Sequence, residues 1–261
     1  MDIKQGFANT TLGKVNYLIC GDPCLPKLVL LHQAPSSAEM YRLLMAQLSN
    51  DFCCIAPDFI GFGNSELIAD VDHSIENYAD SVMQCLQHLD VQDFYLFGHH
   101  TGASVATYIA AHHQDVCKQL ILSGPTLLPD ELRAKLPDLV VPINANANAE
   151  ELEQTWQKFR NKDATVSEHI SKREFNSAVK LGTGYKSAYQ AVCAQDVAQQ
   201  LSSITCSTLV FAGDRDVLQP YVDDALAVLT QGEKIEIGDC STYVCETHPE
   251  RVAKVIKEFI R

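Results

Sequence analysis

The sequence predicts an α/β protein with a mostly parallel central sheet flanked by helices on both faces. Continuous apolar runs such as Leu28–Leu31 are typical of strands buried on both faces. Segments with helical spacing alternate with these runs, and such alternation favours parallel strands joined by helical crossovers. The alternation stops after Ser123-Gly124-Pro125, where a helical and more polar segment begins.

The first part of the chain contains the predicted edge and first inner strands. Val15–Cys20 is expected to be a strand that closes an N-terminal hairpin, and Leu28–Leu31 the next strand. Helical spacing over Ala38–Leu48 predicts a helix, and Phe52–Ala56 predicts a further strand. Pro57-Asp58 and the glycines of Gly61-Phe62-Gly63 then break the chain.

The same rhythm continues to residue 125. One apolar face predicts a helix over Ile75–Leu89, and Phe94–Phe97 predicts a strand. Gly98–Gly102 is expected to form a sharp turn, Ala103–Ala111 a helix of small residues, and Leu120–Leu122 a buried strand. These elements imply repeated strand-helix units of one sheet.

Residues 126–194 are expected to form a helical lid inserted into the core, which comprises residues 1–125 and 195–261. Within the lid, Asn144–Asn148 predicts a loop or the entry to a helix. The core then resumes with a strand over Thr208–Ala212 and a helix over Val222–Leu229. A further strand over Lys234–Ile237 and a closing helix over Pro249–Ile260 follow.

Composition restricts the class of partner. The chain has 261 residues, of which 46% are hydrophobic, enough to bury a full core. The net charge is −13, with 33 acidic and 20 basic residues, whereas nucleic acid and anionic membranes reward clustered Lys and Arg. We therefore expect a small-molecule substrate, no nucleic acid and no membrane as partner, and the sequence leaves a homodimer open.

A cytoplasmic location is expected. Met1–Thr10 lacks a basic region followed by an apolar core, and no apolar run is long enough to span a bilayer. The 10 cysteines lie mostly in apolar patterns and suggest free buried thiols in a reducing compartment. The sequence has no CxxC pair and no His/Cys spacing typical of zinc, so we expect no metal and no cofactor.

Four short passages carry the chemistry, and each follows a predicted strand. They are Leu30-Leu31-His32-Gln33, Asp58-Phe59-Ile60-Gly61-Phe62-Gly63-Asn64-Ser65, Gly98-His99-His100-Thr101-Gly102 and Gly213-Asp214-Arg215-Asp216. In this order they resemble the α/β-hydrolase superfamily over essentially the whole chain. The resemblance implies an α/β-hydrolase fold with the core layout of esterases, haloalkane dehalogenases, epoxide hydrolases and C–C bond hydrolases.

The resemblance also implies roles for individual residues. The strand-to-helix turn Gly98–Gly102 matches the family's nucleophile elbow, which puts His100 where a hydrolase has serine, cysteine or aspartate. A helix N-terminus there favours neutral imidazole. The oxyanion-binding N–H groups would come from Gln33 and Thr101, and the catalytic acid would be Asp216, with Asp214 as an alternative.

The chain departs from the family pattern after the last strand. The family has a histidine there, followed by a glutamate and a proline that begin the final helix. By that spacing the histidine position holds Ser241, and the nearby His248 is expected to lie at the surface. The usual triad is thus altered at two positions, because histidine stands in the place of the nucleophile and serine in the place of histidine.

Three explanations of His100 follow. In the first, His100 is a general acid/base in a hydrolase or lyase that acts on a small ester, lactone or activated carbonyl compound. In the second, His100 activates Ser241 across the cleft, with Asp216 nearby. In the third, the protein is catalytically inactive and binds or senses a small molecule. In each case we expect His100 within hydrogen-bond reach of Ser241 or Asp216. Substrate contacts are expected from Trp156 of the lid, with Arg160 and Arg173 able to bind a carboxylate.

Overall fold

The computed structural model describes residues 2–66, 71–143 and 147–260, and its central sheet has eight strands. The sheet order is β1-β2-β4-β3-β5-β6-β7-β8. The strands are β1 (Lys4–Thr10), β2 (Gly13–Cys20), β3 (Lys27–Leu31), β4 (Cys53–Pro57), β5 (Phe94–His99), β6 (Cys117–Ser123), β7 (Thr208–Phe211) and β8 (Gly232–Lys234).

The predicted mostly parallel sheet is confirmed. Only the β1–β2 and β2–β4 pairs are antiparallel, and every pairing from β4 through β3 to β8 is parallel. In the central register Leu31 lies opposite Gly98, and Ser123 lies opposite both His99 and Phe211. The carboxyl ends of β3, β5, β6 and β7 therefore meet at one edge of the sheet.

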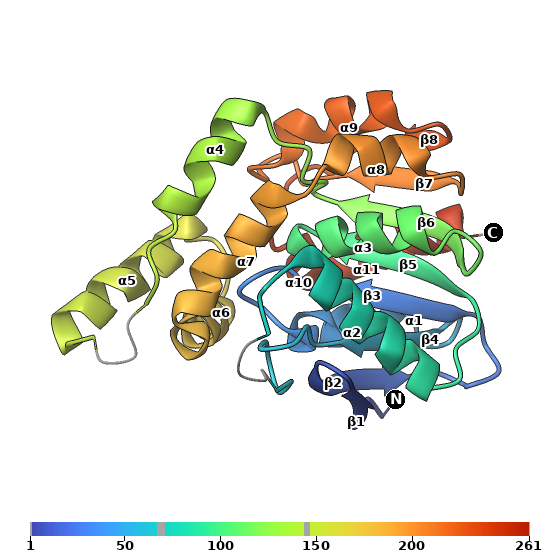
Figure 1. Ribbon diagram of the computed structural model, residues 1–261, viewed down its shortest axis with the longest axis horizontal. Coiled ribbons are helices and arrows are strands. Elements are labelled where there is room, and N and C mark those ends of the chain that lie inside the picture. Colours follow the sequence, from blue (N-terminus) through green and yellow to red (C-terminus); the bar gives the residue numbers. More distant parts are fainter. Residues whose placement is uncertain (1, 67–70, 144–146, 261) are drawn as a thin grey trace.

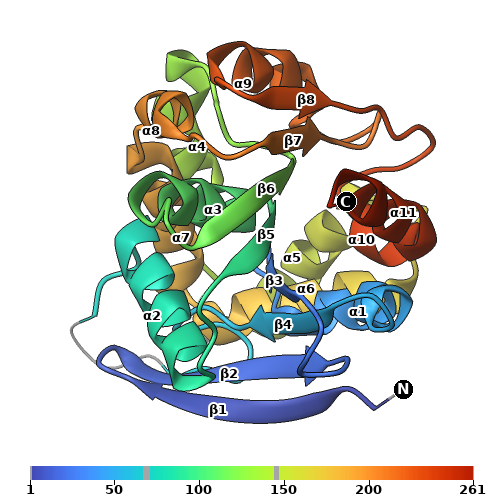
Figure 2. The same cartoon turned by 90° about the vertical axis from the view of Figure 1, so that its right-hand side faces the viewer.

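Helices cover both faces of this sheet (Figure 2). Each strand of the centre is buried on both sides, as its continuous apolar run requires. One face packs against α2 (Ile75–His88), α3 (Thr101–His112), α8 (Val197–Ser203) and α9 (Val222–Val228). The other face packs against α1 (Arg42–Leu48), α10 (Val244–Thr247) and α11 (Pro249–Phe259).

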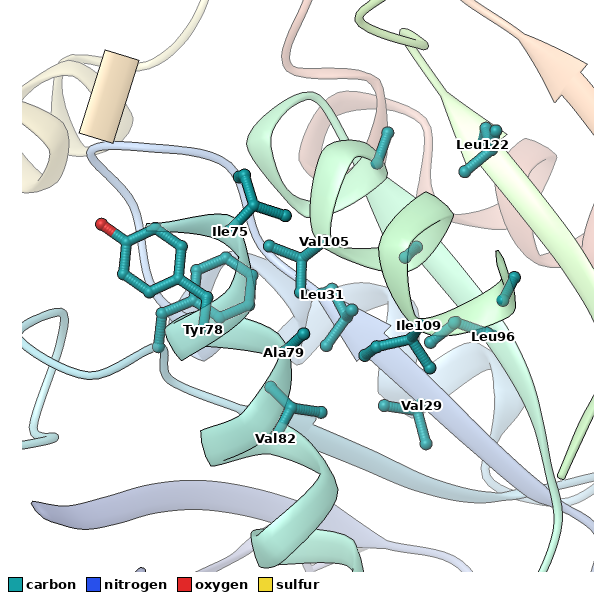
Figure 3. Packing of buried hydrophobic residues seen from close by; sticks show 14 of the residues in the cluster. Val29, Leu31, Ile75, Tyr78, Ala79, Val82, Leu96, Val105, Ile109 and Leu122 are labelled. Atoms are coloured by element: carbon teal, nitrogen blue, oxygen red, sulfur yellow. The ribbon is translucent and has the colours of Figure 1, made fainter. Parts of the chain in front are cut away.

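The packing of α2 and α3 shows how local sequence builds one of these layers (Figure 3). Ser74 caps α2, because its hydroxyl accepts a hydrogen bond from the Asn77 N–H. Tyr78 and Val82 lie one turn apart on the buried face of α2, while Val105 belongs to the buried face of α3. Both faces are apolar; α2 packs against β1 and β2, and α3 packs against β3, β5 and β6.

Of the helices between β6 and β7, four extend beyond the carboxyl ends of the strands (Figure 1), whereas α8 packs on the sheet. The four are α4 (Asp130–Leu139), α5 (Ala149–Lys162), α6 (Glu168–Leu181) and α7 (Thr183–Ala194). We call residues 130–194 the α4–α7 segment. Asn148 forms a capping box with Glu151 at the start of α5, as a helix entry should; residues 144–146 of the predicted Asn144–Asn148 loop lie outside the described residues.

Two elements differ from the sequence-based prediction. The chain over Ala38–Leu48 begins with a 3-10 turn at Ala38–Tyr41 before α1. The predicted strand Lys234–Ile237 ends at Lys234, and Ile237 keeps only a single bridge to Gly213. Because the neighbouring β7 ends at Phe211, little of its edge remains for residues beyond Lys234 to pair with.

None of the helices in the described ranges is long and apolar enough to cross a membrane. All 10 cysteines are free thiols, and seven of them are buried, which agrees with the sequence-based expectation for most of these residues.

His99, the last residue of β5, links three segments at the carboxyl edge of the sheet. Its Nε2–H donates to the Thr242 carbonyl at 2.7 Å, and its Nδ1 accepts from the Ser123 hydroxyl at 2.9 Å. Both bonds require a neutral ring of one tautomer. Burial, together with the neighbouring His100, lowers the pKa of His99 to about 3.

A neutral buried His99 makes folding stability pH-dependent. The unfolded chain takes up a proton near the usual histidine pKa of about 6.5, whereas folded His99 takes it up only near 3, so stability is lost as the pH falls through this window. We expect the free energy of unfolding to fall by about 2 kcal/mol more between about pH 7 and about pH 5 in the wild type than in His99→Gln. Urea unfolding at both pH values measures it; parallel losses in the two proteins would contradict a neutral His99.

Candidate active site

Three loops meet at the carboxyl edge of the sheet, and each brings one of the residues selected from the sequence. Gln33 follows β3, His100 follows β5, and Asp216 follows β7. Parallel strands place the loops at their carboxyl ends side by side, which is where open α/β sheets form ligand sites. Residues far apart in the chain thus come within contact distance.

His100 occupies a strained turn between β5 and α3. Its backbone has φ 51° and ψ −112°, a conformation that side-chain-bearing residues rarely adopt. The flanking glycines permit the turn, because a Cβ at Gly98 would clash with the carbonyl of Gly102 and one at Gly102 with the carbonyl of Leu31. The turn is therefore packed tightly against both the following helix and β3, and it directs the His100 side chain to the end of the sheet.

The imidazole of His100 is hydrogen-bonded to Asp216. Nε2 lies 2.8 Å from Oδ2 of Asp216, whose other oxygen accepts the Leu218 N–H at 2.8 Å. The Asp216 side chain is fully buried, whereas 15% of the His100 side chain is exposed. Of the two partners expected for His100, Ser241 and Asp216, the structure places Asp216 in contact.

The protonation of this pair follows from the carboxylate. Burial by itself raises the pKa of Asp216, but the charge and hydrogen bonds of His100 and the Leu218 N–H outweigh it and lower the pKa to about 2. Asp216 is therefore an acceptor only, so Nε2 of His100 must carry the proton that it donates. In the neutral imidazole, the lone pair is then on Nδ1.

Gly124 determines which edge of the ring is accessible. A Cβ at Gly124 would lie 2.6 Å from Cδ2 and 2.7 Å from Nε2 of His100. The Cδ2–Nε2 edge is thus covered by Gly124 and Asp216. The opposite edge of the ring, which carries Nδ1, is left for a ligand. His100 lines a cavity in which such a ligand would bind.

Gln33 and Thr101 also lie at this cavity. The Thr101 hydroxyl accepts the Ala34 N–H at 3.2 Å and so ties the turn of His100 to the loop after β3. His32 holds the same loop, because its Nδ1–H donates to the Gln33 carbonyl and its Nε2 accepts the Phe59 N–H. Within the described chain, the N–H groups of Gln33 and Thr101 have no protein acceptor.

Ser241 is directed away from His100. Its hydroxyl donates to the Asp163 carboxylate at the end of α5, and the next residue, Thr242, lines the cavity in its place. The loop after β8 is held in this position by the bond from His99 to the Thr242 carbonyl. The structure therefore brings together His100 and Asp216 and leaves Ser241 engaged elsewhere. Asp214, the alternative acid, accepts the Cys240 N–H instead of approaching the imidazole.

The cavity beside His100 measures about 300 Å³ and is mainly apolar. Its polar lining includes the side chains of Thr126 and Tyr189 as well as Lys162, the last residue of α5. The apolar residues that line it come from the sheet edge and from the α4–α7 segment, and they are Ala34, Leu128, Leu132, Leu136, Val192, Val217 and Leu218.

The substrate contacts expected from the α4–α7 segment lie outside this cavity. Trp156 packs edge-on against Phe175 between α5 and α6, with the ring centroids 5.8 Å apart. Arg173 forms a two-bond ion pair with Glu246, and Arg160 donates to the carbonyls of Asp163 and Ala164. Amphipathic packing of the helices accounts for all three, because each side chain joins elements of the fold to one another.

Two charged residues were not predicted from the sequence: Lys162, which lines the cavity, and Glu174, which lies beside Lys162. Lys162 is one of several lysines on polar helices, and no motif distinguishes it. Glu174, fully buried, accepts hydrogen bonds from the Gln33 amide and the Tyr243 hydroxyl, at 2.6 and 3.0 Å. Its only signal in the sequence is a position on the buried face of α6, between Ile170 and Ala178.

Comparison with known proteins agrees with this architecture. The sequence profile of the α/β hydrolase fold matches residues 26–249. Haloalkane dehalogenase 2 from Mycobacterium bovis is 22% identical, over 96% of this chain and 92% of the relative. An esterase from Thermogutta terrifontis has a TM-score of 0.79 at 22% identity, covering 99% of this chain and 98% of the esterase.

An enol-lactonase from Burkholderia xenovorans is also similar in structure, with a TM-score of 0.81, 19% identity, and coverage of 98% of this chain and 99% of the lactonase. At these identities the structural likeness shows the fold. Since the profile spans most of the sequence, from just before β3 to the start of α11, the chain belongs to the α/β hydrolase fold family.

Proposed function

We propose that the protein is a hydrolase of small esters, lactones or activated carbonyl compounds, in which His100 acts as the general base. The single observation that carries the proposal is the His100–Asp216 pair, with Nδ1 on the uncovered edge of the ring. Family membership supports a hydrolase, and an esterase and an enol-lactonase are among the proteins of similar structure. The turn of His100 would be the family's nucleophile elbow.

The proposed reaction begins with water held at Nδ1 of His100. The imidazole takes a proton from the water as its oxygen bonds to the substrate carbonyl carbon, while Asp216 stabilises the imidazolium through Nε2–H. The carbonyl oxygen becomes negative between the N–H groups of Gln33 and Thr101. The bond to the leaving oxygen then breaks, and the proton on Nδ1 passes to that oxygen. Acid and alcohol leave, and the neutral pair is restored.

The pair differs from the arrangement implied by the family resemblance only in the origin of the histidine. Asp216 keeps its place after β7, but its imidazole partner comes from the turn after β5 instead of the loop after β8. Under this proposal Ser241 has no part in proton transfer, and its bond to Asp163 holds the loop after β8 against α5. Residues 126–194 would act as a lid that keeps bulk water from the cavity.

Hydrolysis of 4-nitrophenyl esters and aryl lactones by the wild type and His100→Ala tests the proposal. We expect the wild type to turn over at least one of these compounds and the variant to lose about 100- to 10,000-fold in kcat, the range of a positioned general base. A wild type that is inactive on both series yet gains thermal stability from the same compounds would contradict the hydrolase proposal and favour the alternative, a small-molecule binding or sensor protein.

Asp216→Asn tests the assignment of the proton. The Leu218 N–H would keep the amide oxygen of Asn at the position of Oδ1, which turns the amide NH₂ toward His100. Nε2 must then accept a hydrogen bond, so the proton moves to Nδ1 and the base is lost. We expect kcat to fall by about 100- to 10,000-fold with little change in KM. The ¹⁵N chemical shifts of the ring provide an independent measure of the tautomer. Activity retained with an unchanged tautomer would contradict the assignment.

Gly124→Ala tests the position of the ring. The added methyl would press on Cδ2 and Nε2 of His100 and separate the imidazole from Asp216, so we expect a loss of hydrolysis that exceeds the loss of stability. Gly182→Ala is the matched control. Gly182 also has a positive φ, 56° against 65°, but a Cβ there meets only the Ile143 carbonyl at an ordinary 3.6 Å. Both variants should lose about 1–3 kcal/mol of stability from strain at positive φ. Equal activities in the two variants would contradict the argument.

A further inference from the structure

Lys162 is the only lysine or arginine among the described residues that line the cavity of His100. It ends α5, and a third of its side chain is exposed, although the walls around it are largely apolar. An ammonium group needs three acceptors, and apolar walls supply none. The ammonium instead lies 3.6 Å from a carboxylate oxygen of Glu174 and 5.5 Å from the centroid of the Tyr243 ring.

Glu174 forms an ion pair with Lys162 but accepts no hydrogen bond from it. The carboxylate lies 3.6 Å from the Lys162 ammonium, beyond a normal hydrogen bond, and its two oxygens already accept from Gln33 and Tyr243. Burial disfavours the charged lysine, but Glu174 and the surrounding tyrosines outweigh it, and the pKa of Lys162 is raised. Among the described side chains and carbonyls, none accepts a hydrogen bond from this ammonium, so its donors remain free for a ligand.

The Glu174 carboxylate also connects Lys162 to the proposed oxyanion site at Gln33. Glu174 accepts the Gln33 side-chain amide, and the backbone N–H of Gln33 is one of the two proposed oxyanion donors. A ligand held at Lys162 would thus lie beside the residue that receives the carbonyl oxygen. Since Lys162 and Gln33 line the same cavity, a substrate with both a carboxylate and a reacting carbonyl would have a binding group for each.

We propose that Lys162 is a specificity-determining residue that binds a carboxylate of the substrate, so that the preferred substrates are ester, lactone or carbonyl derivatives of short-chain acids that keep one free carboxylate. This inference rests on the proposed function, because it takes the cavity of His100 as the substrate site. Glu174 is then a positioning residue, which holds the ammonium charged and the Gln33 loop in place. Arg160 and Arg173 have their hydrogen bonds within the fold and are not the anchors.

A matched pair of esters tests the inference. The 4-nitrophenyl monoester of glutaric acid carries a free carboxylate, and its methyl ester does not. One charge-assisted hydrogen bond in a partly desolvated site corresponds to about a 10- to 100-fold preference. We expect the wild type to prefer the carboxylate ester by that factor in kcat/KM, mainly through KM, and we expect Lys162→Met to bring the ratio close to one.

Two further variants separate the anchor from general effects. Lys158→Met removes a lysine one turn earlier on α5. Lys158 lines a neighbouring cavity but not that of His100, so this variant should keep the wild-type ratio.

Because Lys162→Met leaves the buried Glu174 without its neighbouring cation, Lys162→Met/Glu174→Gln is made in parallel. The glutamine can still accept from Gln33 and pair with the Tyr243 hydroxyl, and we expect the same loss of preference in a stably folded protein.

Binding of the monoamide of glutaric acid, which keeps the free carboxylate but has no ester bond, is measured by titration calorimetry and does not depend on ester turnover. We expect Lys162→Met to bind it about 10- to 100-fold more weakly than the wild type does. If no ester is hydrolysed but binding still depends on Lys162, the proposed hydrolysis fails and the carboxylate anchor stands. If Lys162→Met and the double variant bind the probe and rank the two esters as the wild type does, the anchor is overturned.

Discussion

The hydrogen bond between His100 and Asp216 is the interaction on which the rest of the site depends. It joins loops that are 116 residues apart, and its geometry assigns the proton to one nitrogen of the ring. A buried carboxylate is unfavourable unless its oxygens are matched by donors. Asp216 has such donors in His100 and in the Leu218 N–H, so it can remain charged beside an apolar cavity. The charge, the tautomer and the orientation of the imidazole therefore have one common cause.

The turn between β5 and α3 is narrow, and the fold explains how it accommodates the imidazole of His100. A side chain at this turn must leave the backbone at positive φ and pass between tightly packed elements. The ring is accommodated because Gly124, also at positive φ, leaves room beside Cδ2 and Nε2. Its counterpart His99 points into the core from the preceding position, where it bonds to Thr242 and Ser123. The two adjacent rings lie only 4.5 Å apart, centroid to centroid, yet they differ in environment: His99 is hydrogen-bonded inside the core, whereas the turn after β5 brings His100 to the cavity.

Local signals in the sequence predicted the fold, and the resemblance to α/β hydrolases implied the two members of the central pair. Continuous apolar runs, helical spacing and glycines at close approaches are visible in a single sequence, and so is the strand end that carries Asp216. Ser241 was placed by spacing alone, and spacing does not show where a loop side chain points. Trp156 was chosen for its size, but an aromatic residue on an amphipathic helix serves equally well in packing one helix on another. Lys162 and Glu174 could not be found this way, since a lone lysine or glutamate acquires its meaning only from neighbours that are distant in sequence.

The α4–α7 segment contacts the core through polar as well as apolar side chains. Arg173 bonds to Glu246, Asp163 accepts from Ser241, and Glu174 accepts from Gln33 and Tyr243. Buried ionic contacts of this kind add little net stability, because desolvation offsets most of the attraction, but a partner left unmatched is costly. They therefore favour one docked position of the segment over nearby ones. In that position the Glu174 carboxylate contacts both the Lys162 ammonium and the Gln33 side chain. A displacement of α6 would therefore move the lysine charge and the proposed oxyanion donor of Gln33 together. The network that docks the segment is in this way also the network that would align a substrate with His100.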